Sequence, residues 1–568
     1  MSDHPVLAVS DLRVAFGRGA QARQVVRGLS FQVAAGETLA IVGESGSGKS
    51  VTALAIMGLL PKPAARLETG SIRLLGEDLV SLPAETLRRR RGERMAMVFQ
   101  EPMTSLNPVL SIGRQMTEGL VAHGGASARA ALAEAAQMLE RVGIADAAEC
   151  LRRYPHELSG GMRQRVMIAA AMMMRPALLI ADEPTTALDV TVQAQILDLL
   201  RDLTRETGTA LMLVTHDMGV VAEMADRVLV MRHGVGVEQA DVRRLFAAPA
   251  QPYTRRLLAA VPRSDTVPSE AAAPVGGPPL LVTRDLSKSF GSGRLFGRGT
   301  PKRALDGVGF SLGRGEILAV VGESGSGKST LGRAVARLID VDAGSITFDG
   351  QDLVRLSGGA LRRKRAGIQM IFQDPYASLD PRFTIGRTIA EPMLIHGHAN
   401  RAEAPGRAEA LLERVRLERG MAGRYPHEFS GGQRQRVAIA RALAAEPQVI
   451  IADEPTSALD VSVQAQILDL LADLRARDGL SFLFISHDLA VVRRIADRVA
   501  VMRAGRILEI GPTEAVLQAP AHVYTRALLS AAPVPDPLQR ERPRLRLPGA
   551  GYPAGPLVEI SPSHWVAS

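Results

Sequence analysis

Short apolar runs alternate along this chain with longer stretches of helical periodicity. Residues 39–42, 178–181 and 211–214 form three such runs, and each has a counterpart in the second half of the chain. Continuous apolar runs that end at polar residues are typical of strands buried on both faces, and hence of a parallel sheet. The pattern therefore predicts an α/β fold in each half.

Between Gln100 and Ser159 the spacing of apolar residues changes to helical intervals. This spacing predicts a helical insertion whose apolar stripe faces a core and carries no chemistry of its own. The stripe consists of Leu132, Ala135, Leu139 and Val142.

The pattern occurs twice because a whole domain is duplicated. IVGESGSGKS at 41–50 returns as VVGESGSGKS at 320–329, and YPHELSGGMRQR at 154–165 returns as YPHEFSGGQRQR at 425–436. The first copy has extra residues around 59–69. The predicted domains are 6–262 and 281–533, joined by a Pro/Ala/Gly-rich linker at 263–280 and followed by a Pro/Arg-rich, extended tail at 534–568.

Composition excludes several classes of protein. Cys150 is the single cysteine of the 568 residues, so disulfides within the chain and cysteine-bound zinc or iron–sulfur sites are not expected. No run approaches the roughly 18 apolar residues of a spanning helix, and no secretory signal is visible, so other chains would supply any membrane part. The net charge of +9 fits nucleic acid or a membrane surface, but solvated arginine-rich segments such as 88–91 and 362–365 are the favoured interpretation.

The repeated glycine-rich loop matches G-x-x-x-x-G-K-[ST] in both copies, each time between an apolar run and a helical pattern. Its backbone N–H groups and the following helix would bind phosphate, its lysine would reach the β/γ-phosphates and its serine would hold Mg²⁺. The residues are Gly43, Glu44, Ser45, Gly46, Ser47, Gly48, Lys49 and Ser50, and then Gly322, Glu323, Ser324, Gly325, Ser326, Gly327, Lys328 and Ser329 with Thr330.

Acidic pairs end a predicted strand in each copy, Asp182-Glu183 and Asp453-Glu454. Carboxylates at the carboxyl end of such strands face the crevice where α/β folds bind ligands. The aspartate would anchor Mg²⁺ and the glutamate would orient the attacking water. His216 and His487 follow the next strand and would contact the γ-phosphate.

Two further motifs keep alternative interpretations at this point. Gln100 and Gln373 follow apolar runs and either cap a strand or contact Mg²⁺ and water. Ser159, Gly160 and Gly161, like Ser430, Gly431 and Gly432, open basic helices; they are plain N-caps or a second anion site.

Taken together, GESGSGKS, LSGGM, IADE, TALD and TH, repeated as GESGSGKS, FSGGQ, IADE, SALD and SH, resemble the nucleotide-binding domains of ABC transporters over most of the chain. The resemblance implies an α/β fold of two tandem P-loop domains, each with a mostly parallel core sheet, a small antiparallel β subdomain and a helical subdomain. It implies ATP and Mg²⁺ as cofactors, with Gln100 and Gln373 at the metal and Phe16 and Phe290 stacking on adenine.

QEPMTSLNPVLSIGRQ, QDPYASLDPRFTIGR and the closing PYTRRLLAAVP and VYTRALLSAAP are similar to the dipeptide, oligopeptide and nickel import ATPases. Some relatives carry a cysteine cluster for an iron–sulfur centre, which this sequence lacks, so no such cluster is expected. Peptide, glutathione or microcin-type import is implied. The partners would be two integral membrane permease subunits and an extracytoplasmic binding protein, at the cytoplasmic face of the inner membrane.

In that family the two halves pair head-to-tail, so each ATP would lie between one half's phosphate loop and the other half's SGG helix. Lys49, Asp182, Glu183 and His216 would act with 430–432, and Lys328, Asp453, Glu454 and His487 with 159–161. The rival interpretations are a soluble tandem ATPase acting on ribosomes or nucleic acid, a drug-export ATPase, a nickel or other solute importer and a non-catalytic module. The short, nearly uncharged linker and the two intact Glu/His sets argue against the first and last of these.

Overall fold

The computed structural model describes residues 5–17, 22–101, 105–123, 125–186, 188–259, 261, 277–291, 302–457, 459–545 and 552–568. The chain forms two compact units. Unit 1 comprises Met1–Val261 and Pro533–Arg542, and unit 2 comprises Pro262–Ala532 and Pro543–Ser568. Most of the predicted linker, 263–276, lies outside the described residues. No helix in the described ranges is both long and apolar enough to cross a membrane.

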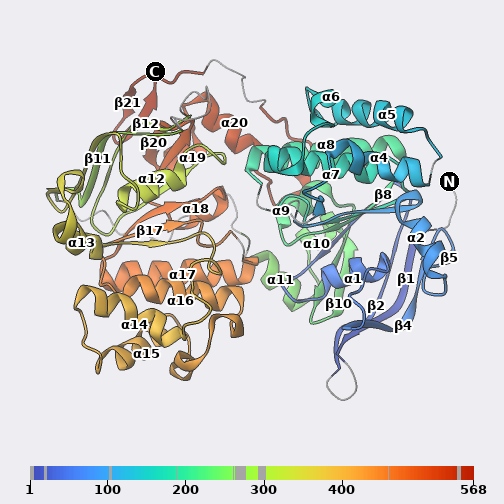
Figure 1. Cartoon of the computed structure of the whole chain (residues 1–568), viewed down its shortest axis with the longest axis horizontal. Helices are drawn as coiled ribbons and strands as arrows, with labels where there is room; N and C mark the ends of the chain where they lie inside the picture. The colour runs from blue at the N-terminus through green and yellow to red at the C-terminus, as the bar shows by residue number, and fades with distance from the viewer. Residues whose placement is uncertain are drawn as a thin grey trace. The chain divides into compact units, whose positions relative to one another are not determined.

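Each unit is built on a sheet whose central strands are parallel (Figure 1). In unit 1 the strand order is β10 (Val235–Asp241), β9 (Arg227–Arg232), β3 (Thr38–Val42), β8 (Ala210–Val214), β7 (Leu178–Asp182) and β6 (Met95–Val98), with only β10 antiparallel. Every residue of β3, β7 and β8 is buried. The apolar runs therefore form strands covered on both faces, as the sequence predicts.

Unit 2 repeats this sheet and lengthens it. Its order is β16 (Ile368–Ile371), β17 (Val449–Asp453), β18 (Ser481–Ile485), β13 (Ile317–Val321), β19 (Arg498–Arg503), β20 (Arg506–Pro512), β22 (His564–Ala567) and β21 (Leu557–Ser561). The last two strands come from the region expected to be an extended tail. That expectation was wrong here, because Val558, Ile560 and Val566 belong to two strands joined by a turn, and β22 pairs with β20.

The tail differs from expectation in a second place. Residues 533–542 belong to unit 1 and contain a short 3₁₀ turn, η6 (Pro537–Gln539). The Arg540 guanidinium donates to the carbonyl oxygens of Met224 at 2.9 Å and Ala225 at 3.3 Å, and to Asp226 Oδ1 at 3.2 Å. These carbonyls end helix α9 (Met218–Met224), where a cation is electrostatically favoured.

A four-stranded antiparallel sheet accompanies each parallel sheet. The orders are β2 (Arg23–Val33), β1 (Leu7–Phe16), β4 (Ala65–Leu74) and β5 (Glu77–Asp78) in unit 1, and β12 (Lys302–Leu312), β11 (Leu281–Phe290), β14 (Ala343–Phe348) and β15 (Gln351–Asp352) in unit 2. The extra residues of the first copy lengthen β4, so that Ala65 pairs with Phe16 at the far end of β1.

The helices divide between those that flank the parallel sheet and those of the insertion. In unit 1 they are α1 (Lys49–Ile56), α2 (Ala84–Glu93), α4 (Ile112–Ala122), α5 (Ala128–Arg141), α6 (Ala147–Cys150), α7 (Gly160–Met172), α8 (Val190–Thr207), α9, α10 (Val242–Ala247) and α11 (Pro252–Ala259). In unit 2 they are α12 (Lys328–Val335), α13 (Gly358–Ala366), α14 (Ile385–His396), α15 (Ala404–Arg414), α16 (Gly431–Leu443), α17 (Val461–Asp478), α18 (Leu489–Ile495), α19 (Thr513–Gln518) and α20 (Val523–Ala531).

The helical insertion predicted between Gln100 and Ser159 is confirmed as α4, α5 and α6. Ala135, Leu139 and Val142 are fully buried in a core shared with α7, whereas Leu132 is 43% exposed and was wrongly placed in the core-facing stripe. The misplacement arises because Ala131, one position earlier, is the residue that faces the core.

The N-termini of α7 and α16 show how the SGG motifs are built. Ser159 Oγ accepts from the Met162 N–H and Ser430 Oγ from the Gln433 N–H, both at 3.3 Å. In unit 2 the Gln433 side chain also accepts from the Ser430 N–H at 3.0 Å, which completes a capping box. Met162 cannot accept this bond, so α7 has only half of the box.

We expect Met162→Gln to complete the box and to stabilise unit 1 by about 0.5–1 kcal/mol, and Gln433→Met to destabilise unit 2 by a similar amount. Calorimetric unfolding of the full chain measures both changes. Met162→Leu is the matched control and should leave the unfolding temperature unchanged. A capping role is excluded if the two variants move stability in the same direction.

Candidate active site

The glycine-rich loop of unit 1 joins β3 to α1 and fits tightly against the end of β9. Gly43 has φ 154° and Gly48 has φ 100°. A Cβ atom on Gly43 would lie 2.2 Å from the Met231 carbonyl oxygen, and one on Gly322 would lie 2.0 Å from that of Met502. Only glycine allows the loop backbone to lie this close to the strand end. The N–H groups of the following loop residues are then available to bind a phosphate at the start of the helix.

The loop lysines begin the helices and are almost buried. Lys49 Nζ donates to the carbonyl oxygens of Gly43 at 2.8 Å and Glu44 at 3.0 Å. Lys328 Nζ does the same toward Gly322 at 2.7 Å and Glu323 at 2.9 Å. Each ammonium group therefore lies at the cradle, as the motif predicts.

Oxygen ligands suited to a hard cation lie beside each loop. Ser50 Oγ donates to Asp182 Oδ1 at 3.1 Å, and Ser329 Oγ donates to Asp453 Oδ1 at 3.0 Å. The described residues contain no group of three or more His, Cys, Asp or Glu side chains that could hold a metal ion. One carboxylate and one hydroxyl fit Mg²⁺, which usually takes one or two protein oxygens and completes its shell with water and phosphate. Among the residues that the structure describes, the buried Ser47 and Ser326 hydroxyls have no hydrogen-bond partner, so both are available to a bound phosphate.

The second acid of each pair is held at the strand end in an unusual conformation. Glu183 has φ 46° and Glu454 has φ 47°, a left-handed region that non-glycine residues seldom adopt. Their N–H groups donate to the Val214 carbonyl at 2.8 Å and the Ile485 carbonyl at 2.9 Å, ends of the neighbouring strands. Strain of this kind collects at functional sites.

Three side chains bind the Glu183 carboxylate. Gln100 Nε2 donates to Oε2 at 2.8 Å, Thr186 Oγ1 donates to Oε2 at 2.9 Å, and His216 Nδ1 lies 3.0 Å from Oε1. In unit 2, Gln373 Nε2 donates to Glu454 Oε2 at 2.8 Å and His487 Nδ1 lies 3.2 Å from the same oxygen. The predicted glutamine, glutamate and histidine thus meet in both units.

Burial and pairing separate the pKa values of the two adjacent acids. Burial raises the pKa of Asp182 to about 6 despite the hydrogen bond from Ser50, and burial also raises the pKa of Asp453. Burial acts in the same direction on Glu183 and Glu454, but the partner histidine outweighs it and lowers the pKa of each. Burial opposes the charge on His216 and His487, and the glutamates outweigh it and raise the pKa of both imidazoles. The lowered pKa of the glutamate therefore favours its ionised form in each unit.

The remaining predicted residues lie elsewhere in each unit. Phe290 is 48% exposed and Phe16 is half-buried, both at strand ends, so neither is a core residue. Ser159 and Ser430 with their glycines begin helices that pack against the helical insertion. Stacking on adenine and completion of a partner's site remain predictions.

Sequence reasoning missed three residues that contact these groups, Thr186, Tyr253 and Tyr524. Thr186 belongs to the TTALD motif, but nothing in the motif's spacing shows that its hydroxyl reaches Glu183. Tyr253 and Tyr524, in the closing PYT and VYT motifs, contact the glycine-rich loops through their hydroxyl groups. The recurrence of these motifs at the end of each predicted domain was a signal, but it indicated a family and not a contact.

Comparison with known proteins decides the family. The model of the ABC transporter family matches residues 26–186 and 305–457, more than half of the chain. The chain belongs to the ABC transporter ATP-binding family. The oligopeptide/dipeptide transporter C-terminal region matches residues 237–290 and 508–552. The fold and the site together make this family member an ATPase.

Similar proteins match the chain from end to end. It is 51% identical over 602 residues to the glutathione import ATP-binding protein GsiA of Escherichia coli K12, covering 99% of this chain and 96% of that protein. It is 50% identical to GsiA of Salmonella typhimurium, covering 100% and 97%. A solved ATP-binding cassette, MJ0796 in a dimeric post-hydrolysis state, is 30% identical with a TM-score of 0.38 and covers 41% of this chain and 98% of its own.

The raised pKa of Asp182 gives a stability prediction for the nucleotide-free ATPase. A folded-state pKa above the unfolded value means that ionised Asp182 opposes folding, fully above pH 6 and not at all below about pH 4. Asp182→Asn should therefore stabilise unit 1 at pH 7.5 by about 1–3 kcal/mol.

The gain should shrink as the pH falls from 6 toward 4, and chemical denaturation in the presence of a chelator would measure it. Asp202→Asn, on the exposed side of α8, is the matched control and should leave the stability at pH 7.5 nearly unchanged. A destabilising Asp182→Asn at pH 7.5 would contradict the desolvation argument.

Proposed function

We propose that this ATPase energises the import of glutathione or similarly short peptides through a binding-protein-dependent transporter. The observation that carries the proposal is the identity of 50–51% to GsiA proteins over the full chain, joined to an oligopeptide-type extension in both units. The subunit would act at the cytoplasmic face of the membrane, bound to two permease subunits supplied by other chains. Nickel or another solute is the alternative cargo.

The side chains of each unit support ATP hydrolysis by positioning and charge stabilisation. Lys49 and the loop amides would bind the phosphates, and Ser50 with Asp182 would hold Mg²⁺. When bound, the metal supplies positive charge at the phosphate oxygens. Glu183 would accept a hydrogen bond from the attacking water, while His216 keeps the carboxylate ionised and aimed. Unit 2 has the same set.

Completion of each site by the other unit's SGG helix is the remaining part of the proposal. The N-terminus of α16 would face the loop of unit 1, and that of α7 the loop of unit 2. Both helices have serine N-caps and carry helix-dipole charge suited to an anion. Fusion in one chain would fix the ratio of the halves and give an effective concentration of about millimolar order.

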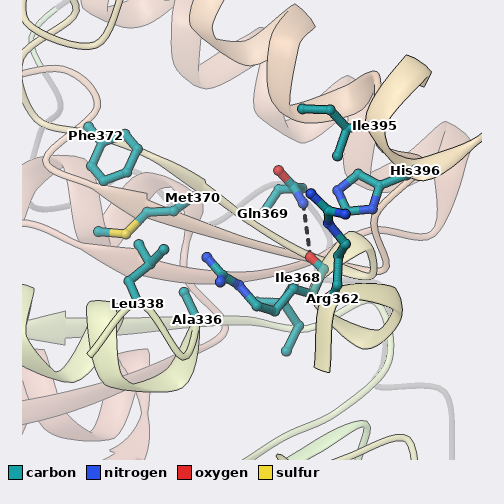
Figure 2. Close-up of a pocket in the computed structure, with 10 residues that line it drawn as sticks. Ala336, Leu338, Arg362, Ile368, Gln369, Met370, Phe372, Ile395 and His396 are labelled. Carbon is teal, nitrogen blue, oxygen red and sulfur yellow. Dashed lines mark hydrogen bonds between the residues drawn. The ribbon is translucent and has the colours of Figure 1, made fainter. Parts of the chain in front are cut away.

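A pocket in unit 2 is a suitable contact for a permease segment. A cavity of about 280 Å³ lies between the end of α12, α13, β16 and the end of α14, and Arg362, Phe372 and His396 are among its lining residues (Figure 2). Gln369 in its wall donates to the Arg365 carbonyl at 2.9 Å. Phe372 directly precedes Gln373, which binds the catalytic Glu454, so an occupant of this pocket would press on a residue adjacent to the active site.

The charge on the arginine runs favours transport over nucleic-acid binding. Arg88 pairs with Glu85 at 2.7 Å and Arg90 with Glu77 at 2.7 Å, so part of the run in α2 is neutralised by acids of the same unit. On a surface that binds nucleic acid, such guanidinium groups would instead be available to pair with the phosphates.

Both glutamates should be essential if the two sites work as a pair. Glu183→Gln and Glu454→Gln, made separately, should each lower ATP hydrolysis by the full chain by about 10²-fold, because each removes one general base. Steady-state phosphate release measures the rates. A silent substitution at either position would contradict two competent, coupled sites.

Reconstitution tests the transport function. Co-expression with two permease chains of a glutathione importer should recruit the ATPase to membranes, and glutathione-loaded binding protein should raise its ATP hydrolysis several-fold. Arg362→Glu should weaken recruitment because it reverses charge in the pocket, while ATP binding by the free chain stays unchanged.

Arg355→Glu is a matched control, since Arg355 is exposed on the surface of unit 2 and does not line the pocket. Stimulation by another solute but not by glutathione or short peptides would overturn the proposed cargo. Recruitment unaffected by Arg362→Glu would remove the pocket from the interface.

A further inference from the structure

The closing PYT and VYT motifs contain a tyrosine that reaches the phosphate loop in both units. The Tyr253 hydroxyl, on α11, accepts from the Glu44 N–H at 3.3 Å. The Tyr524 hydroxyl, on α20, accepts from the Glu323 N–H at 3.4 Å. Glu44 and Glu323 are the second residues of the two loops, so the extension touches the loop backbone where it leaves the sheet.

Each tyrosine is buried and is held by an arginine. The Arg232 guanidinium lies 4.9 Å from the Tyr253 ring centroid, and that of Arg503 lies 4.7 Å from the Tyr524 ring centroid. These arginines end β9 and β19 and follow Met231 and Met502, whose carbonyls abut the first loop glycines. In each unit the strand end therefore contacts both the tyrosine and the phosphate loop.

The start of each extension helix is fixed by a buried or half-buried acid of the preceding strand. Glu238 on β10 accepts from the N–H groups of Ala250 at 2.8 Å and Gln251 at 3.0 Å. Glu509 on β20 accepts from those of Ala521 at 2.9 Å and His522 at 3.1 Å. The position of each tyrosine is thus set by the sheet and not by a free loop.

The two units differ in the residues that pack over the arginine, the tyrosine and the strand acid. In unit 2 the Tyr552 ring lies 4.1 Å from the Arg503 guanidinium, and His564 Nε2 lies 2.8 Å from Glu509 Oε1, which has no exposed surface. Both residues come from the C-terminal segment 552–568, whose strand β22 pairs with β20. In the described part of unit 1, β10 is instead the edge strand of its sheet.

We propose that Tyr253 and Tyr524 are positioning residues for ATP hydrolysis, each fixing the second residue of its phosphate loop, and that segment 552–568 tightens this hold in unit 2 alone. A loop already held in its binding conformation loses less conformational entropy when nucleotide binds. The proposal rests on the ATPase activity and not on the identity of the cargo.

The proposal is tested with full-length variants in which one of the two loop lysines is replaced by alanine, so that only the other loop binds a fluorescent ATP analogue. In a Lys49→Ala background, Tyr524→Phe should weaken binding by about three- to ten-fold, the equivalent of one hydrogen bond, without lowering the unfolding temperature. Phenylalanine keeps the ring against Arg503 and removes only the hydroxyl. Tyr552→Leu should weaken binding in the same background.

The Lys328→Ala background supplies the matched comparison. There Tyr253→Phe should weaken binding, and Tyr552→Leu should have no effect because Tyr552 belongs to unit 2. In the otherwise unmodified chain, Tyr524→Phe should raise the KM for ATP more than it lowers kcat. Unchanged affinity in both phenylalanine variants would overturn the positioning role, and equal effects of Tyr552→Leu in the two backgrounds would overturn its restriction to unit 2.

Discussion

Two adjacent carboxylates at the end of a buried strand set the main constraint on each unit. Water is excluded from β7 and β17, so Asp182 and Asp453 are costly to ionise, and the neighbouring glutamate can remain charged only with a partner. His216 and His487 provide that partner, and Gln100 and Gln373 complete it. The strand order places β8 and β18, which the histidines follow, beside the strands that carry the acids. This order therefore stabilises the charged glutamates as well as the packing of the sheet.

This constraint explains why sequence alone could predict so much of the catalytic site. Carboxyl ends of neighbouring parallel strands share one edge, so residues that follow separate apolar runs must meet there. Lys49, the adjacent pair Asp182-Glu183, and His216 come from three distant parts of the sequence, and their positions at strand or helix ends were enough to group them. The role of Gln100 was undecided by spacing; its side chain donates to the Glu183 carboxylate, and its contact with Mg²⁺ stays a prediction.

Other features had no local signal in the sequence. The left-handed conformation of Glu183 depends on its N–H donating to Val214 on the next strand, a contact that only the folded sheet creates. The tail was misjudged because its proline and arginine content obscured two short strands, and their partner β20 lies in a distant part of the chain. Leu132 was misplaced by one helical position, since α5 turns Ala131 toward the core instead.

The duplicated units keep the same acids, bases and loop lysines but differ in the structure that supports them. A capping box present on α16 is incomplete on α7. Within the described ranges β10 is an edge strand, whereas its counterpart β20 pairs with β22. ATP hydrolysis requires the same groups around the phosphates in both units. The residues that hold these groups in place can differ between the units without altering the reaction. Two sites with identical catalytic residues can therefore bind nucleotide with different affinity, and the asymmetry of such an ATPase is to be sought around the phosphate loop and not in the Glu/His pair.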